Sequence, residues 1–193
     1  MKYLTLLFLA LMLSFHADAK SKHFYSSYYE IHQFKSSLAK HEYSAKKITY
    51  YLKRRKLPKS FIIIPYIESN FNNYARSRKG ARGMWQLMPF TARLMGIQVN
   101  RHRDDRINFA RSTHAALKYI QNLYYYYHGN DILVVAAYNA GKGRVDSTLK
   151  KIHGYHSGRK ETQFMLDLPR ETQRYVGRYK VLKTYVDSRY FKI

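Results

Sequence analysis

Residues 109–127, FARSTHAALKYIQNLYYYY, carry the clearest helical pattern in the chain. Their apolar side chains recur every three or four residues and therefore share one face of a helix. This face holds Phe109, Ala110, Ala116, Leu117, Ile120, Leu123, Tyr124 and Tyr127. We predict that Asp104 or Asp105 caps the helix, because a carboxylate can accept hydrogen bonds from the free amides of a first turn.

Shorter helical patterns lie on both sides of this segment. They cover residues 44–56, 58–68, 89–95, 132–139 and 169–186. Pro58 suits a first turn, Pro65 predicts a kink, and Asp131 can cap the helix that follows it. No long segment alternates between polar and apolar residues, and 193 residues suit one domain. We therefore expect a single, mainly α domain with a polar loop at residues 70–82.

The N-terminus has the pattern of a secretory signal at residues 1–19. Lys2 precedes an apolar stretch, and the triplet ADA at 17–19 fits the small-x-small rule for cleavage. The stretch is too short to span a bilayer comfortably, so we favour cleavage after Ala19 over a transmembrane anchor. Residues 20–43 form a basic lead-in that we expect to be partly helical or loosely docked. The predicted product is exported to the periplasm or envelope of a bacterium.

The chain is strongly cationic and contains no cysteine. It has 35 Lys and Arg against 12 Asp and Glu, a formal net charge of +23. Such a charge implies an anionic partner, and nucleic acid, phospholipid head groups and a carboxylate-bearing cell wall all qualify. The absence of cysteine excludes a disulfide framework and a thiol-attached lipid.

Glu68 stands out because it directly follows the apolar run FIIIPYI at 61–67. At the C-terminal end of a helix its carboxyl feels the negative end of the helix dipole, and apolar neighbours withdraw water from it. Both effects raise the pKa of a carboxyl, and a carboxyl that stays protonated near neutral pH can serve as a general acid. The alternative is a surface glutamate at a frayed helix end.

Three more motifs follow in order: GMWQLMP at 83–89, AAYNAG at 136–141 and LPRETQRYV at 168–176. Together with Glu68 and Ser69 they resemble the soluble lytic transglycosylase family of lysozyme-like enzymes. Within the family the chain looks most like the catalytic domain of the membrane-bound type D branch. The resemblance covers roughly residues 44–187. It implies a mainly α, lysozyme-like fold with a substrate groove, in a catalytic domain at residues 44–193.

The resemblance also implies roles for single residues. Glu68 matches the catalytic acid and base. The positions that match residues lining the substrate groove or closing the site are Ser77, Gln86, Met88, Tyr138, Asn139, Glu171 and Tyr175. Simpler roles compete with some of these, because an amide can cap a helix and Met88 can belong to the core. Trp85 can stack on a sugar ring or lie in the core.

The reaction that the resemblance implies uses one carboxyl, whereas ordinary glycosidases use two. Glu68 protonates the bond between N-acetylmuramic acid and N-acetylglucosamine, and the N-acetyl group of the substrate stabilises the positive centre. Glu68 then takes the proton of the sugar's own 6-hydroxyl, which closes a 1,6-anhydro ring. The partner is a peptidoglycan glycan strand, and no metal or cofactor is needed.

Two other functions remain open from the sequence. The first is a goose-type-lysozyme-like hydrolase of the same bond, which needs a positioned water. The second is an inactive cationic protein of the envelope or one that binds nucleic acid; we do not expect nucleic-acid binding, because the basic residues are scattered over every segment. The cluster KRRK at 53–56 is explained as a solvated helix end or as a site for anionic stem peptides.

Overall fold

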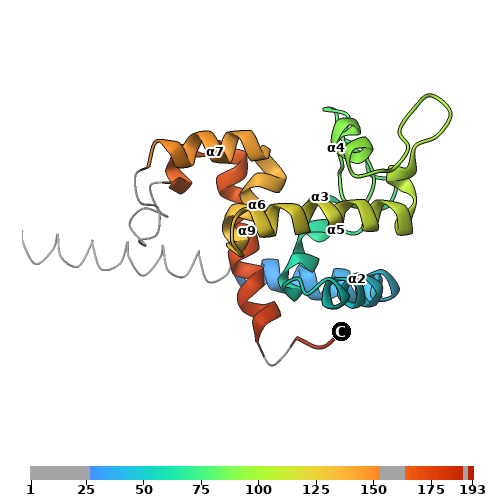
Figure 1. The fold of residues 1–193 in the computed structure, drawn as a ribbon. Coiled ribbons are helices and arrows are strands. Elements are labelled where there is room, and N and C mark those ends of the chain that lie inside the picture. Colours follow the sequence, from blue (N-terminus) through green and yellow to red (C-terminus); the bar gives the residue numbers. More distant parts are fainter. Residues whose placement is uncertain (1–26, 153–163, 189–190) are drawn as a thin grey trace, which may run out of the picture.

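The strongest pattern in the sequence predicts a helix, and the structure has α5 (Phe109–Tyr126) there. This helix runs through the middle of the molecule. The computed structural model describes residues 27–152, 164–188 and 191–193 (Figure 1). The cap of α5 differs from the prediction, because the side chain of Asn108 accepts a hydrogen bond from the Arg111 amide. Asp104 instead accepts from the Arg106 amide and caps the short 3₁₀ turn η2 (Asp105–Ile107).

The described part of the chain is mainly α, as expected. Besides α5 and η2, its elements are α2 (Glu42–Arg54), η1 (Lys59–Ile62), α3 (Ile63–Ser69), α4 (Pro89–Leu94), α6 (Asp131–Ala140), α7 (Lys142–Lys150) and α9 (Arg170–Asp187). Residues 27–40 and 164–167 are also helical. The loops between α3 and α5 are joined by isolated antiparallel bridges that pair Arg76 with Arg82, Arg82 with Leu87, and Val99 with Asp104.

Two of the predicted helix starts are different in the structure. The segment predicted as one kinked helix at 58–68 is the turn η1 followed by α3, so that Pro65 lies in the first turn of α3. A first turn has no acceptor for the missing proline amide, and the ring is tolerated there. Asn130, rather than Asp131, caps α6, because Asp131 accepts a hydrogen bond from Tyr179 of α9.

Helix α6 lies at the centre of the core and positions the two helices that follow it. Val134, Val135, Ala136 and Ala137 are fully buried. Helix α6 packs against α5, α7 and α9, and α9 also packs against α3 and η1. Figure 1 shows α7 and the start of α9 on the same side of the molecule, next to the end of α6. These contacts bring the C-terminal end of α6 close to the start of α9.

The lead-in is well docked in its described part. Phe34 is fully buried, and its ring lies 4.9 Å from that of Tyr66 in α3. Glu30 accepts hydrogen bonds from Arg178 of α9, the shorter at 2.7 Å. The expectation of helix is confirmed for residues 27–40, and loose docking is wrong there because Phe34 enters the shared core. The predicted signal at 1–19 and residues 20–26 lie outside the described residues.

Within residues 27–152, 164–188 and 191–193, no helix is long and apolar enough to cross a membrane.

Candidate active site

A groove of about 390 Å³ opens where α3, the loop before α4, the end of α6 and the starts of α7 and α9 meet. Seven residues predicted from the sequence line it: Glu68, Ser77, Gln86, Met88, Tyr138, Asn139 and Glu171. Tyr175, the eighth, contacts Glu68 directly. Residues that are more than 100 positions apart in the sequence therefore meet at one place.

Glu68 lies in the last turn of α3, where its partly buried carboxyl faces the groove. The Oη of Tyr175 donates a hydrogen bond of 2.8 Å to its Oε1. The pKa of Glu68 is raised to about 7. Burial is the largest cause, the hydrogen bond from Tyr175 lowers the pKa, and the charge of Glu171 raises it. This agrees with the direction expected from the sequence. The carboxyl can thus be protonated near neutral pH.

Tyr138 and Tyr175 supply neutral hydroxyl groups around this carboxyl. Burial and the nearby charge of Glu68 raise the pKa of both tyrosines well above the usual value. The Oη of Tyr138 donates a hydrogen bond of 2.7 Å to the carbonyl oxygen of Trp85. Next to it, Asn139 Oδ1 is buried and has no hydrogen-bond partner among the described residues. Asn139 is therefore a groove residue whose side-chain oxygen is a buried, unsatisfied acceptor.

The loop that carries Gln86 depends on Gly83. Gly83 has φ +82°, and a Cβ at this position would lie 1.9 Å from the carbonyl oxygen of Arg106, so that only glycine fits. Gln86 itself has φ +45°. Its Nε2 donates hydrogen bonds to the carbonyl oxygens of Gly83, at 2.8 Å, and Ala75, at 3.2 Å. The side-chain nitrogen Nε2 of Gln86 thus stabilises the loop, and the residue also lines the groove.

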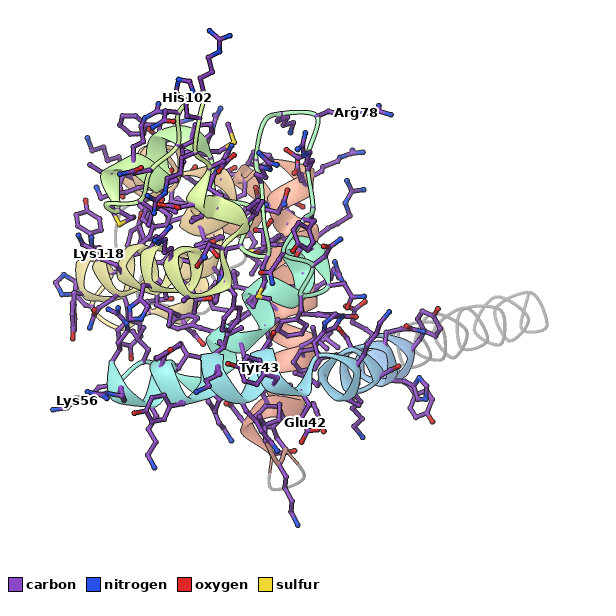
Figure 2. All side chains as sticks on the ribbon, turned by 90° about the vertical axis from the view of Figure 1, so that its right-hand side faces the viewer. Glu42, Tyr43, Lys56, Arg78, His102 and Lys118 are labelled. Atoms are coloured by element: carbon purple, nitrogen blue, oxygen red, sulfur yellow. The ribbon has the colours of Figure 1, made fainter. Side chains whose placement is uncertain are left out.

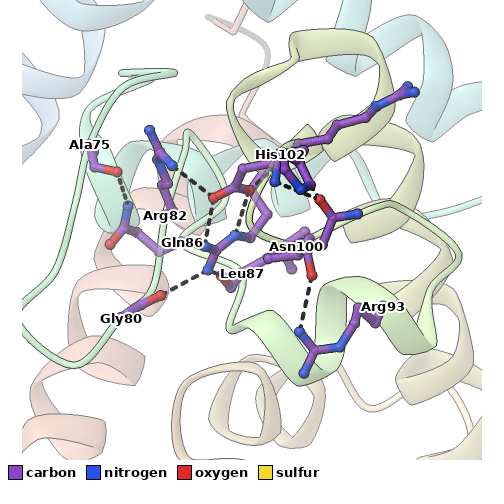
Figure 3. Close-up of polar contacts among 12 residues, drawn as sticks. Ala75, Gly80, Arg82, Gln86, Leu87, Arg93, Asn100 and His102 are labelled. Atoms are coloured by element: carbon purple, nitrogen blue, oxygen red, sulfur yellow. Dashed lines mark hydrogen bonds and ion pairs between the residues drawn. The ribbon is translucent and has the colours of Figure 1, made fainter.

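An ion-pair network also stabilises this loop (Figure 3). Arg106 is buried and donates to both carboxylate oxygens of Asp104. Its Nη1 donates to the carbonyl oxygens of Gly80 and Leu87, at 2.8 and 3.1 Å. Arg82 adds a second cation to Asp104 at 2.8 Å. The hydrogen bonds from these arginines, chiefly Arg106, lower the pKa of Asp104 to about 2, so this carboxylate is a structural anion.

The remaining predicted residues have clear positions. Ser77 Oγ accepts a hydrogen bond from the Ala81 amide and so closes the loop turn. Met88 is 44% exposed, so it belongs to the groove wall rather than to the core. Trp85 is fully buried, and its Nε1 donates to Thr113 Oγ1 at 3.0 Å, which excludes stacking on a sugar ring.

Sequence reasoning missed several residues of the groove, among them Lys79, Arg144 and Thr172. Lys79 forms an ion pair of 3.3 Å with Glu171. A single lysine or arginine gives no signal in a chain with 35 of them. The signal that could have found Arg144 is its position three residues after the motif at 136–141.

A larger cavity of about 830 Å³ lies between the helix at 27–40, α2 and residues 191–193. Among the described residues that line it, the one acidic residue is Glu42, which is exposed and paired with Lys46 at 2.6 Å. The Lys46 hydrogen bond lowers the pKa of Glu42. Among its described lining residues this cavity therefore has no carboxyl with a raised pKa, and size alone does not identify the active site.

Basic side chains point in several directions. Figure 2 shows Arg78, His102, Lys56 and Lys118 at separate places on the molecular surface. No group of three or more possible metal ligands occurs within the described residues.

Comparisons with known proteins show which family the chain resembles. Over 132 residues the chain is 39% identical to the membrane-bound lytic murein transglycosylase D of Escherichia coli K12, a match that covers 68% of this chain and 28% of that protein. The chain therefore spans less than a third of that relative's length.

Two solved structures are also similar. The 70 kDa soluble lytic transglycosylase of Escherichia coli matches with a TM-score of 0.62 and 27% identity, over 72% of this chain and 23% of the other. An inactive glutamate-to-glutamine mutant of the lytic transglycosylase Slt of Pseudomonas aeruginosa matches with a TM-score of 0.58 and 29% identity, over 74% of this chain and 23% of the other. The family model described as "Transglycosylase SLT domain" matches residues 46–161. The chain belongs to the transglycosylase SLT domain family.

Proposed function

We propose that this protein is a peptidoglycan lytic transglycosylase, which cleaves the β-1,4 bond between N-acetylmuramic acid and N-acetylglucosamine and forms a 1,6-anhydromuramyl product. The observation that carries the proposal is the Glu68 carboxyl, which lines the groove with a pKa of about 7. A carboxyl with this pKa can donate a proton near neutral pH and take one back in the next step.

The first step is proton donation to the glycosidic oxygen. Because Glu68 Oε1 accepts the hydrogen bond from Tyr175, the proton of the neutral carboxyl lies on Oε2. That proton passes to the leaving oxygen as the bond to C1 of the muramic acid breaks. The hydrogen bond from Tyr175 also stabilises the carboxylate that remains, since hydrogen bonds to charged groups are stronger than neutral ones.

The second step uses no water. The substrate's N-acetyl group stabilises the positive charge at C1, and the 6-hydroxyl of the same sugar attacks C1. Glu68, now a carboxylate, accepts the hydroxyl proton, so that the enzyme returns to its starting state. In this scheme Asn139 helps to form the groove wall beside the sugar.

The other lining residues bind and orient the strand. Tyr138 lies close enough to Glu68 for the carboxylate charge of Glu68 to raise the pKa of Tyr138. The positions that we assign to substrate binding are Ser77, Gln86, Met88, Tyr138, Asn139, Glu171 and Tyr175. All but Tyr175 line the groove, which supports the assignment.

A hydrolase of the same bond is the second candidate, because Glu171 is a second carboxylate on the groove wall. A hydrolase would need this carboxylate to activate a water molecule. Against this role, Glu171 is paired with Lys79 at the exposed rim. The two reactions differ in their products, since the anhydro product is lighter by one water.

We further propose that residues 44–193 carry the catalytic domain and that residues 1–19 are a signal peptide for export to the periplasm or envelope of a bacterium. The substrate of the proposed reaction lies outside the cytoplasm, which supports export.

The test is digestion of purified sacculi by the wild-type protein and by the variants Glu68→Gln and Glu42→Gln, followed by mass spectrometry of the muropeptides. We expect anhydro-muropeptides from the wild type and from Glu42→Gln, which removes an exposed carboxylate outside the groove. We expect none from Glu68→Gln. Hydrolysed products from the wild type would instead support the second candidate.

A further inference from the structure

The charges on the groove wall do not balance. Apart from Glu68, the charged lining residues are Lys79, Arg144 and Glu171. Lys79 and Glu171 are of opposite sign and form an exposed ion pair of 3.3 Å with each other. The guanidinium of Arg144 has no hydrogen bond or ion pair with any residue in the described ranges. Together with a protonated Glu68, this leaves Arg144 as an uncompensated cation facing the groove.

The backbone that carries Arg144 is held firmly. Arg144 lies in the first turn of α7, next to the fully buried Val145. Two residues on, Asp146 accepts hydrogen bonds from Tyr127, the C-cap of α5, at 2.9 Å and from Lys142 at 2.7 Å. These contacts join α7 to the end of α5. Arg144 thus has a fixed backbone and an exposed head group that is unpaired within the part of the chain that the structure describes.

The other basic cluster considered for anionic peptides lies elsewhere. None of residues 53–56 lines the groove. Arg54 donates to Tyr50 Oη, and Arg55 donates to Gln121 Oε1, both at 3.1 Å. These contacts fit the simpler role of a helix end. They leave Arg144 as the cation best placed to meet an anionic group of a strand bound at Glu68.

We infer that Arg144 binds a carboxylate of the stem peptide that the cleaved muramic acid carries, and that it makes the groove selective for peptide-bearing strands with free carboxylates. This inference rests on the proposed function. The anion is identified by its chemistry, because a glycan strand itself is neutral apart from its muramic acid substituents, and because a guanidinium pairs with a carboxylate through two parallel hydrogen bonds.

The test compares two forms of soluble, uncross-linked peptidoglycan strands: one with free stem carboxylates and one whose carboxylates have been converted to amides. The value of kcat/KM is measured on both for the wild type, Arg144→Ala, Arg144→Lys and Arg101→Ala. Arg101 is exposed and outside the groove, so its removal gives the same change in net charge. Product mass is recorded in the same digests, which separates failure of the proposed reaction from failure of this inference.

For the wild type we expect amidation to lower kcat/KM about fivefold, the effect of one partly shielded ion pair. Arg144→Ala should show the same loss on free strands and no further loss on amidated ones. Arg144→Lys should keep part of the selectivity, and Arg101→Ala should match the wild type. In a Glu68→Gln background, binding affinities for the two strand forms give the same comparison without turnover. Equal behaviour of Arg144→Ala and Arg101→Ala, or undiminished sensitivity of Arg144→Ala to amidation, would overturn the inference.

Discussion

Tyr175 of α9 and Glu68 of α3 are joined by a hydrogen bond of 2.8 Å, although they lie 107 residues apart in the sequence. The tyrosine hydroxyl donates to a carboxyl that burial has made a weak acid. The pair links the last long helix to the end of the apolar run, and in the proposed reaction it fixes which carboxyl oxygen gives the proton.

Replacing Tyr175 by Phe should slow the reaction and change its pH dependence. The hydrogen bond lowers the pKa of Glu68, so its loss should raise that pKa and move the alkaline limb of the pH–rate profile to higher pH. We expect kcat to fall about tenfold, because a hydrogen bond to the developing carboxylate is lost. Tyr179→Phe is the matched control, since Tyr179 contacts Ser60 and Asp131 and not Glu68. An unmoved alkaline limb in Tyr175→Phe would contradict the assignment.

Glu68→Gln should be more stable than the wild type at alkaline pH. The pKa of Glu68 is about 7 in the folded state, and the reference value of 4.5 applies to the unfolded state. Between these pH values the native state therefore binds more protons than the unfolded state. The free energy of unfolding of the wild type therefore falls as pH rises from 4.5 to 7. The full difference corresponds to at most about 3 kcal/mol.

Urea unfolding of Glu68→Gln and wild type at pH 4 and pH 8 measures this effect. The stability gain of the variant should be larger at pH 8 than at pH 4. Glu42→Gln should show no such gain, because the pKa of the exposed Glu42 is lowered by Lys46. A gain that does not depend on pH would mean that the carboxyl of Glu68 is not protonated in the native state.

Gly83→Ala should destabilise the groove loop strongly. The new Cβ would meet the Arg106 carbonyl oxygen at 1.9 Å, in a backbone with φ +82°. We expect a loss of about 3 kcal/mol or more in the free energy of unfolding. Gly80→Ala is the control, because Gly80 has a similar φ of +90° but no atom within 4 Å of a Cβ. It should lose only about 1 kcal/mol, and equal losses in thermal or urea unfolding would exclude a steric cause.

Asp104→Asn should remove a stabilising anion under the loop. The folded pKa of Asp104, about 2, lies below the usual 3.8, so its stabilisation is complete above pH 4 and disappears as pH falls towards 2. We expect the variant to lose about 2 kcal/mol at pH 7, measured by urea unfolding, and to approach the wild type near pH 2. Asp187→Asn, at a more exposed ion pair with Lys183, should lose less. A deficit that persists at pH 2 would point to altered packing instead.

Local pattern was enough to predict most helices and the candidate acid. The pattern at 109–127 predicted the C-terminal end of α5 to within a residue, whereas the cap predicted at Asp104 or Asp105 placed its start three or four residues too early. The apolar run before Glu68 predicted a carboxyl with a raised pKa. Helical periodicity is a property of neighbouring residues, and so is the end of an apolar run. Both can therefore be identified before the chain is folded.

The sequence did not show which residues cap α5 and α6, because several residues compete for the same hydrogen-bond partners. Asp104 and Asp131 are both suited to capping a long helix, but Arg106 and Tyr179 engage them instead. Asn108 and Asn130 cap those helices in their place. Which donor a carboxylate meets depends on elements that fold against it from elsewhere in the chain.

The amino-acid sequence by itself determined the helical character of the protein and the position of Glu68 at the end of α3. Only the tertiary structure decided that Trp85 is core, that Tyr175 reaches Glu68, and that Arg144 lines the groove with no partner among the described residues. The physical reason is the distance along the chain over which each effect acts. Helix propensity and apolar periodicity act between near neighbours. Burial, ion pairing and groove shape depend on distant segments, which meet only when α3, α6, α7 and α9 pack together.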